Sequence, residues 1–245
     1  MPDDKIVTAA VLVIGDEILS GRTKDRNIGT IATHLTSIGI QLREVRVVPD
    51  VEAEIVTALN ALRRRYSYVF TTGGIGPTHD DITADSVAAA FDVPIAVDPR
   101  AKAQLATYYN ARKLELTPAR LRMARVPTGA ELIENKVSGA PGFVIGNVVV
   151  MAGVPDIMQA MLETVTPLLV TGAPLQSITI EIDQPESEIA AVFGAHQRRY
   201  PDITMGSYPL LRHGQPASDL VLRGIDPERL KLAELELRAA LRLPK

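Results

Sequence analysis

The residues best suited to chemistry lie in one short segment, Thr71–Asp85, whose sequence is TTGGIGPTHDDITAD. Its glycines allow positive φ angles and let the backbone come close to a ligand. The N–H groups of such a turn, followed by a helix N-terminus, favour a bound phosphate. We therefore predict an anion-binding loop here, formed by Thr72, Gly73, Gly74, Gly76, Pro77, Thr78 and Thr83, with the backbone amides of 73–76 holding phosphate.

Three carboxylates, Asp80, Asp81 and Asp85, crowd the same segment. Carboxylates repel phosphate unless a cation lies between them, and Mg²⁺ in proteins is typically held by one or two carboxylates together with substrate phosphates. The segment therefore predicts a phosphate site assisted by Mg²⁺ or another divalent cation, with Asp80 and Asp81 as metal ligands. The alternative is structural: Asp81 or Thr83 caps the following helix and Asp85 complements its dipole.

The elements around this segment are typical of an α/β protein. The near-continuous apolar run 6–14 predicts a central parallel strand, and 41–48 and 66–70 predict two more. Helical apolar stripes follow each strand, at 28–38, from Pro49-Asp50 onward, and at 84–90. Three strand-then-helix units predict a three-layer α/β/α fold with a mostly parallel sheet.

Acidic residues follow each of these strands. Asp16 and Glu17 come after the first strand, Asp50 after the second, and Asp80 with Asp81 after the third. The carboxyl ends of neighbouring parallel strands meet at one edge of the sheet, so we expect these side chains to gather on one rim. Asp50 also occupies the cap position of the predicted helix that follows it, which is the alternative role for this residue.

The rest of the chain predicts a domain over 1–170 and a second one over 175–245. Residues 143–151 predict two strands around a Gly146-Asn147 turn, and the helix 154–170 is expected to kink or stop at Pro167. Ser138-Gly139 lie in either a second ligand loop or a tight turn. After a linker at 171–174, the order β-α-β-β-α predicts a small α+β domain, with 212–218 as a loop.

Composition narrows the classes of function. The chain has 245 residues and a net charge of −3, without a basic tail, which argues against nucleic-acid binding. It has no Cys, which excludes disulfides, thiolate metal sites and a Cys nucleophile. The uncharged run 137–155 is broken by glycines and prolines, so no membrane span is predicted. The acidic start, Met1–Lys5, is not a signal peptide, and we expect a cytoplasmic protein.

Several ordered motifs resemble the molybdopterin-binding (MoaB/Mog-like) domain, and most closely the amino-terminal part of the competence/damage-inducible protein A (CinA) family. The matching pieces are GDEILSG at 15–21, then Asn27, Asp50, TTGGIGPTHDDIT at 71–83, Asn135, APGF at 140–143 and GVP at 153–155. The tail resembles the small KH-like domain that follows in that family.

The resemblance implies ligands and roles that the residues alone do not. It implies binding of molybdopterin or a nucleotide, with Asp50 and Asp81 as the functional carboxylates. The implied activity is either metal-dependent hydrolysis of a phosphoanhydride in ADP-ribose-like or flavin dinucleotides, with Mg²⁺, Mn²⁺, Co²⁺ or Ni²⁺, or molybdopterin binding or adenylyl transfer without hydrolysis. It also implies a homo-oligomer, a dimer or a trimer. The further ligand contacts that it implies are Gly15, Asp16, Glu17, Gly21, Asn27, Gly153 and Pro155. Ser138 and Gly139, which stand where the family has a different residue, are predicted contacts from the ligand-loop interpretation of their own segment.

Overall fold

The computed structural model describes residues 6–243 and divides into two compact units, Met1–Gly172 and Ala173–Lys245. Met1–Lys5, for which the sequence predicts no signal peptide, lie outside the described residues. Between residues 6 and 243, no helix combines the length and the apolar character needed to cross a membrane.

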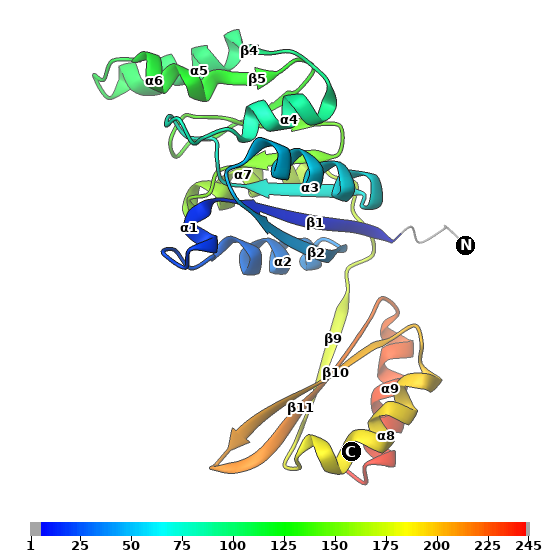
Figure 1. Ribbon diagram of the computed structural model, residues 1–245. Helices are drawn as coiled ribbons and strands as arrows, with labels where there is room; N and C mark the ends of the chain where they lie inside the picture. Colours follow the sequence, from blue (N-terminus) through cyan, green and yellow to red (C-terminus); the bar gives the residue numbers. More distant parts are fainter. Residues whose placement is uncertain (1–5, 244–245) are drawn as a thin grey trace. The chain divides into compact units, whose positions relative to one another are not determined.

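The first unit is built on a six-stranded sheet in the order β2-β1-β3-β8-β7-β6 (Figure 1). The four strands β2, β1, β3 and β8 are parallel, while β7 and β6 run antiparallel to their neighbours. The confirmed fold class is thus a mostly parallel α/β sheet. The strands are β1 (Val7–Ile14), β2 (Ile40–Val48), β3 (Tyr68–Thr72), β6 (Glu131–Ile133), β7 (Gly142–Ile145) and β8 (Val148–Met151).

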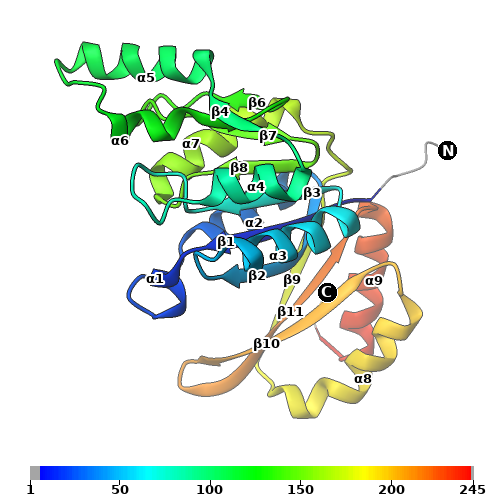
Figure 2. The ribbon, with the colours of Figure 1, turned by 45° about the horizontal axis from the view of Figure 1, so that its top comes forward.

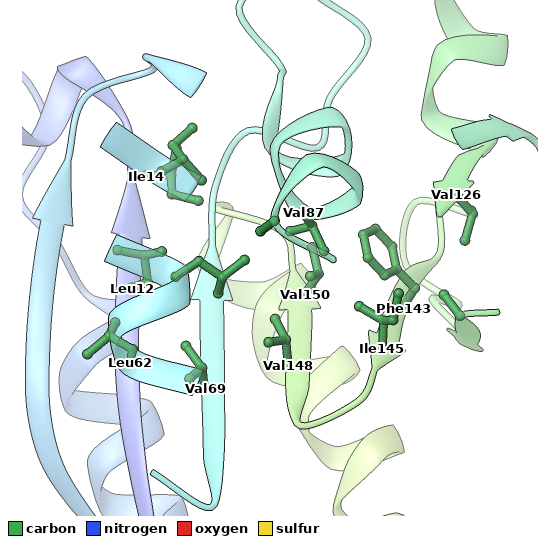
Figure 3. Close-up of a cluster of buried hydrophobic side chains, with 14 of the residues drawn as sticks. Leu12, Ile14, Leu62, Val69, Val87, Val126, Phe143, Ile145, Val148 and Val150 are labelled. Atoms are coloured by element: carbon green, nitrogen blue, oxygen red, sulfur yellow. The ribbon is translucent and has the colours of Figure 1, made fainter. Parts of the chain in front are cut away.

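Helices cover both faces of this sheet. On one face α3 (Glu52–Arg65) packs on β1 and beside α4 (Thr83–Phe91), in a core that includes alternate residues of β1 such as Leu12 (Figure 3). The helix α5 (Pro99–Ala111) adds Ala101 and Leu105 to the same core. On the other face α2 (Asn27–Ser37) and α7 (Pro155–Val165) pack on the intervening residues, among them Val11. Burial of β1 on both faces explains why its sequence is apolar throughout rather than alternating.

The helix expected over 154–170 stops near Pro167, as predicted: α7 ends at Val165 and continues as a 3-10 turn, η2 (Thr166–Leu168), because Pro167 cannot donate a helical hydrogen bond. Other elements differ from the sequence predictions. A short helix, α1 (Asp16–Leu19), follows β1. The small antiparallel sheet of β4 (Ile95–Val97) and β5 (Arg125–Pro127) accompanies α6 (Pro118–Leu121) and η1 (Arg122–Ala124). Figure 2 shows β4 and α6 near α5.

The second unit is a three-stranded antiparallel sheet in the order β10-β11-β9. Its elements are β9 (Gln176–Ile182), α8 (Glu186–Arg199), β10 (Thr204–Arg212), β11 (Gln215–Gly224) and α9 (Pro227–Ala240). The predicted loop at 212–218 is wrong, because Arg212 pairs with Gln215 across a two-residue turn. His213 and Gly214 both have positive φ, 53° and 77°, which suits the turn types that close tight hairpins.

Asn147 gives a test of the hairpin that joins β7 and β8. Its side-chain amide donates to the carbonyl oxygens of Arg63, at 2.9 Å, and Tyr66, at 3.0 Å, at the end of α3. Asn147→Ala leaves both acceptors without this donor, and we expect it to lower the unfolding free energy by about 1–3 kcal/mol. Calorimetry, which can resolve separate transitions for the two units, measures the change. Asn110→Ala, at an exposed position of α5, is the control, and equal losses would contradict the prediction.

Candidate functional site

The glycine-rich loop connects β3 to α4 at the carboxyl edge of the parallel strands. Gly73 has φ 102°, and a Cβ there would lie 2.1 Å from the carbonyl oxygen of Ile14 at the end of β1. A Cβ on Gly153, just after β8, would lie 3.2 Å from the Cα of Gly73. The ends of β1, β3 and β8 thus come together where only glycine fits.

Thr83 ties the start of α4 to this loop. Its buried hydroxyl donates to the carbonyl oxygen of Gly73 at 2.9 Å, and its amide donates to that of Gly74 at the same distance. The N-cap residue of α4 is Ile82, with no side-chain cap hydrogen bond. The alternative in which Asp81 or Thr83 caps this helix is therefore wrong, and the threonine acts as a brace instead.

Asp81 organises the tip of the loop. Its carboxylate accepts hydrogen bonds from the amide of Gly76 at 2.6 Å, the amide of Thr78 at 2.8 Å and the Thr78 hydroxyl at 2.6 Å. Most of the hydrogen-bonding capacity of this carboxylate is used within the loop. Its assignment as a metal ligand and catalytic residue stays a prediction, to which the structure adds a positioning role.

The amides predicted to hold phosphate fall into two pairs. The Gly73 amide donates to the Met151 carbonyl oxygen at 3.3 Å, and the Gly76 amide to Asp81, so these two are already engaged. In this respect the prediction needs correction. The amides of Gly74 and Ile75 have no hydrogen-bond acceptor within residues 6–243, so this pair remains available to an anion.

Asp50 stands at the centre of the acidic rim. Its carboxylate accepts a hydrogen bond from the Asp16 amide at 3.0 Å, which joins the end of β2 to the end of β1. Burial raises the pKa of the Asp50 carboxyl, and repulsion from Asp16, Glu17 and Asp80 raises it further, against the lowering effect of the Asp16 amide. The predicted cap role is wrong, because the N-cap residue of α3 is Val51.

The other carboxylates of the segment differ in setting. Asp85 forms a two-point ion pair with Arg125, with nitrogen–oxygen distances of 2.8 and 2.6 Å, so its charge is largely compensated. Asp80 is exposed at the loop tip, where the nearby Thr78 side chain and the Asp80 backbone amide lower the pKa of its carboxyl. The neighbouring His79 side chain is almost fully exposed. Asp80 and Asp50 therefore remain the carboxylates best placed to meet a ligand.

The donor set suits a cation held partly by its ligand. Across the described part of the chain, no three or more His, Asp or Glu side chains form a ready metal cage. Mg²⁺ commonly takes one or two carboxylates and completes its shell with water and phosphate oxygens. Asp50 and Asp80, which repel each other in the absence of a cation, fit that kind of site.

The side of the site next to β8 contains polar groups that lack partners. Asn27, the first residue of α2, donates from its side-chain amide to the carbonyl oxygen of Gly153 at 2.7 Å. Its carbonyl oxygen, and the hydroxyls of Thr71 and Thr72, are buried without a hydrogen-bond partner. Such groups are costly in a folded protein unless water or a ligand satisfies them. The placement of Asn27 and Thr72 is consistent with their predicted role as ligand contacts.

The second predicted loop, at Ser138-Gly139, is held by Asn135. The Asn135 carbonyl oxygen accepts from the amides of Val137 and Ser138, and its amide donates to the Ala140 carbonyl oxygen at 2.8 Å. Gly139 has φ 75° and packs against Tyr108 of α5. Sequence reasoning missed Tyr108, because nothing in the pattern of α5 links it to a loop about 30 residues away.

The remaining predicted contacts are distributed around the same edge. Gly15 follows β1 and donates to the Val48 carbonyl oxygen at 3.1 Å. Gly21 follows α1 with φ 72° and an open surrounding, and Pro155 is the first residue of α7. Pro77 and Thr78 are exposed at the loop tip.

Thr83→Val tests the brace between the loop and α4. The substitution keeps the side-chain shape but removes the hydroxyl bonded to the Gly73 carbonyl oxygen, and we expect a loss of about 1–3 kcal/mol in unfolding free energy. Amide hydrogen exchange should also become faster at Gly74 and Ile75. Thr107→Val is the matched control, since its exposed hydroxyl also bonds a backbone carbonyl. A similar loss in both variants would show that Thr83 has no special role.

Asp50→Asn tests the raised pKa. The folded protein binds a proton at Asp50 more tightly than the unfolded chain does, so the ionised carboxylate destabilises the fold above the raised pKa. We expect the variant to be more stable at pH 7, by at most about 1 kcal/mol because the group is only partly buried. The advantage should disappear as pH falls below the ordinary value of 3.8.

Thermal unfolding of the wild type and the Asp50→Asn variant at several pH values measures this difference. Asp202→Asn provides a control of opposite sign, because hydrogen bonding to Arg229 lowers the pKa of Asp202. That variant should be less stable than the wild type at pH 7. A destabilised Asp50→Asn variant at pH 7 would contradict the prediction.

Comparison with known families supplies a relationship for each unit. Residues 10–171 match the probable molybdopterin binding domain, and residues 174–244 match the FAD synthase middle domain. A protein from Aeropyrum pernix is 35% identical over 210 residues, which cover 82% of this chain and 78% of the relative. One from Archaeoglobus fulgidus is 30% identical over 225 residues, covering 91% and 93%.

Relatives named after CinA match the first unit. A CinA-like protein from Desulfosudis oleivorans is 38% identical over 160 residues, which cover 64% of this chain and 39% of that protein. The crystal structure of the protein CinA with unknown function from Thermoplasma acidophilum is 36% identical and superposes with a TM-score of 0.61, covering 65% of this chain and 97% of that one. The chain belongs to the family of proteins with a probable molybdopterin binding domain, and it is similar to the CinA-like members of that family.

Proposed function

We propose that the first unit binds a phosphate-bearing nucleotide or pterin at the acidic rim and hydrolyses a phosphoanhydride bond with the help of a divalent cation. One observation carries this proposal: Asp50 lies among Asp16, Glu17 and Asp80 beside a loop with free amides. Acids and phosphate are compatible in one site when a cation lies between them. The cation would be Mg²⁺, with Mn²⁺, Co²⁺ and Ni²⁺ as alternatives.

Each group has a distinct role in this proposal. The amides of Gly74 and Ile75 bind a phosphate oxygen, and Asp80 holds the cation, with Asp81 keeping the loop in shape or joining Asp80 as a ligand. The bound cation supplies stabilisation of the negative charge that grows on the phosphoryl oxygens. Asp50, whose raised pKa makes it the more basic carboxylate, orients the attacking water and accepts its proton.

The substrate class in this proposal is a dinucleotide of the ADP-ribose or flavin type. The first unit contributes a phosphate-binding loop, and the second unit matches a domain named for FAD synthase. A compound with two linked phosphates offers both the bond to be cleaved and two groups for recognition. We also expect self-association into a dimer or a trimer, which light scattering on the purified chain can determine.

The second candidate is a protein that binds molybdopterin, or transfers an adenylyl group to it, without hydrolase activity. The family match over residues 10–171 favours it, as do the unpartnered buried groups of Asn27 and Thr72. A heterocycle rich in N–H and C=O groups could satisfy them. Pterin or AMP retained on the purified protein, without AMP release from dinucleotides, would distinguish this function from the first.

The activity can be tested by AMP release from ADP-ribose, FAD, NAD and ATP, with and without Mg²⁺, Mn²⁺, Co²⁺ or Ni²⁺. We expect metal-dependent cleavage of ADP-ribose or FAD. Asp50→Asn should lower the rate by about 100-fold or more at saturating metal. Asp80→Asn should mainly raise the metal concentration needed for half-maximal rate, and Asp81→Asn should lower turnover by disturbing the loop.

Asp183→Asn, which alters an exposed carboxylate of the second unit, is the control and should leave the rate unchanged. Unchanged turnover in both Asp50→Asn and Asp81→Asn would remove these residues from the mechanism. If no substrate releases AMP with any of the metals, the hydrolase proposal fails.

A further inference from the structure

A small cavity lies on the other side of the glycine-rich loop from the acidic rim. In the sheet order, β1 and β2 with their acids flank β3 on one side, whereas β8 and β7 flank it on the other. The cavity is bounded by Gly74, Ile75 and Gly76, by the start of β7, and by η1 with the first residue of β5. Two cationic side chains line it, those of Arg122 and Arg125.

The charges around this cavity are unequally compensated. Arg125 is engaged by Asp85 through two hydrogen bonds of 2.8 and 2.6 Å. The Asp81 carboxylate, which also lines the cavity, accepts three hydrogen bonds within the loop. Arg122 is exposed and has no ion pair, hydrogen bond or aromatic partner among residues 6–243. Its guanidinium is therefore the one charge lining this cavity that is not used by the described structure.

The cavity is partly open and has a volume of about 20 Å³, which is enough for one water molecule or one oxygen atom of a larger group. The Gly74 and Ile75 amides, which have no acceptors, belong to residues that line it. With the carboxylates of Asp81 and Asp85 already engaged, unpartnered amides of two lining residues and a free guanidinium suit a single anionic oxygen in a space of this size. The rest of a phosphate group would stay outside, toward solvent and the rim.

We propose that Arg122 binds the second phosphate of a diphosphate ligand, with one of its oxygens in this cavity, while the first phosphate lies at the acidic rim. The inference rests on the proposed function and makes it more specific. On the rim side of the loop 74–76 the carboxylates need a cation, whereas on the cavity side Asp81 is satisfied by its loop and Asp85 by Arg125, which leaves the charge of Arg122 available. A ligand with two linked phosphates can use both sides, whereas a monophosphate can use only one.

Arg122 is thus a specificity residue that selects diphosphates over monophosphates. A charge-assisted hydrogen bond from a guanidinium is stronger than one between neutral groups, and its loss should weaken binding by about tenfold or more. Only ligands that reach the cavity should suffer this loss. An effect through general folding would instead weaken all ligands together.

The test compares AMP with α,β-methylene-ADP, in which a carbon replaces the bridging oxygen between the phosphates and prevents cleavage. Calorimetric titration of the full chain in the presence of Mg²⁺ measures both affinities. We expect the wild type to bind the diphosphate analogue at least about tenfold more tightly than AMP. Arg122→Ala should remove most of this preference and change AMP affinity less than about twofold, and Arg122→Lys should keep part of it.

Arg120→Ala is the matched control, because Arg120 stacks on Tyr109 and donates to the Glu115 carbonyl oxygen, away from the cavity. It should leave the preference for the diphosphate unchanged. Circular dichroism and thermal unfolding check that each variant is folded. If Arg122→Ala does not fold, the ligand preference of Arg122→Lys tests the role of Arg122 instead.

The outcomes separate this inference from the function on which it rests. If the wild type binds both ligands and Arg122→Ala keeps the full preference, the role of Arg122 is refuted while phosphate binding stands. The same holds if the wild type binds AMP and the analogue equally well. If the wild type binds neither AMP nor the analogue, the proposed function is refuted, and this inference, which rests on it, is refuted as well.

Discussion

The site depends on a steric constraint at the ends of three strands. The Ile14 carbonyl oxygen lies where a side chain on Gly73 would begin, and Gly153 packs against Gly73 from the other side. Only glycine allows this approach together with the positive φ that turns the chain away from β3. Because the loop leaves the sheet here, the ends of β1 and β8 both lie against its first glycine. A larger residue at 73 would separate the strand ends that the site combines.

Hydrogen bonds then fix the loop in a definite shape. Thr83 holds its start from α4, and Asp81 holds its tip through the amides of Gly76 and Thr78. These contacts use some polar groups and leave others free, so the same backbone contains engaged amides at 73 and 76 and available ones at 74 and 75. Rigid support of a few free donors is what makes a loop of this kind selective, since little order is lost when a ligand binds.

Electrostatics divides the surroundings of the loop into two sides. Toward β1 and β2, burial and repulsion by neighbouring carboxylates both raise the pKa of Asp50. This grouping of acids is unfavourable unless a cation compensates their charge. Toward β7, two arginines, Arg122 and Arg125, accompany the acids, and Asp85 is compensated by Arg125. Acids that lower the free energy of unfolding when no ligand is bound are typical of functional sites, where residues are selected for binding or catalysis rather than for stability.

The sequence by itself determined the three strand-then-helix units at the start of the chain, the mostly parallel sheet and the position of the glycine-rich loop. These features follow from local periodicity, from glycine chemistry and from the topological rule that parallel strand ends share an edge. Tertiary structure decided how each side chain is used. Asp50 contacts the Asp16 amide rather than capping α3, Asp85 pairs with Arg125, and Asp81 bonds its own loop. The physical reason is that a carboxylate pairs with whichever donor the fold brings within reach, and Asp85 and Arg125 are 40 residues apart in the chain.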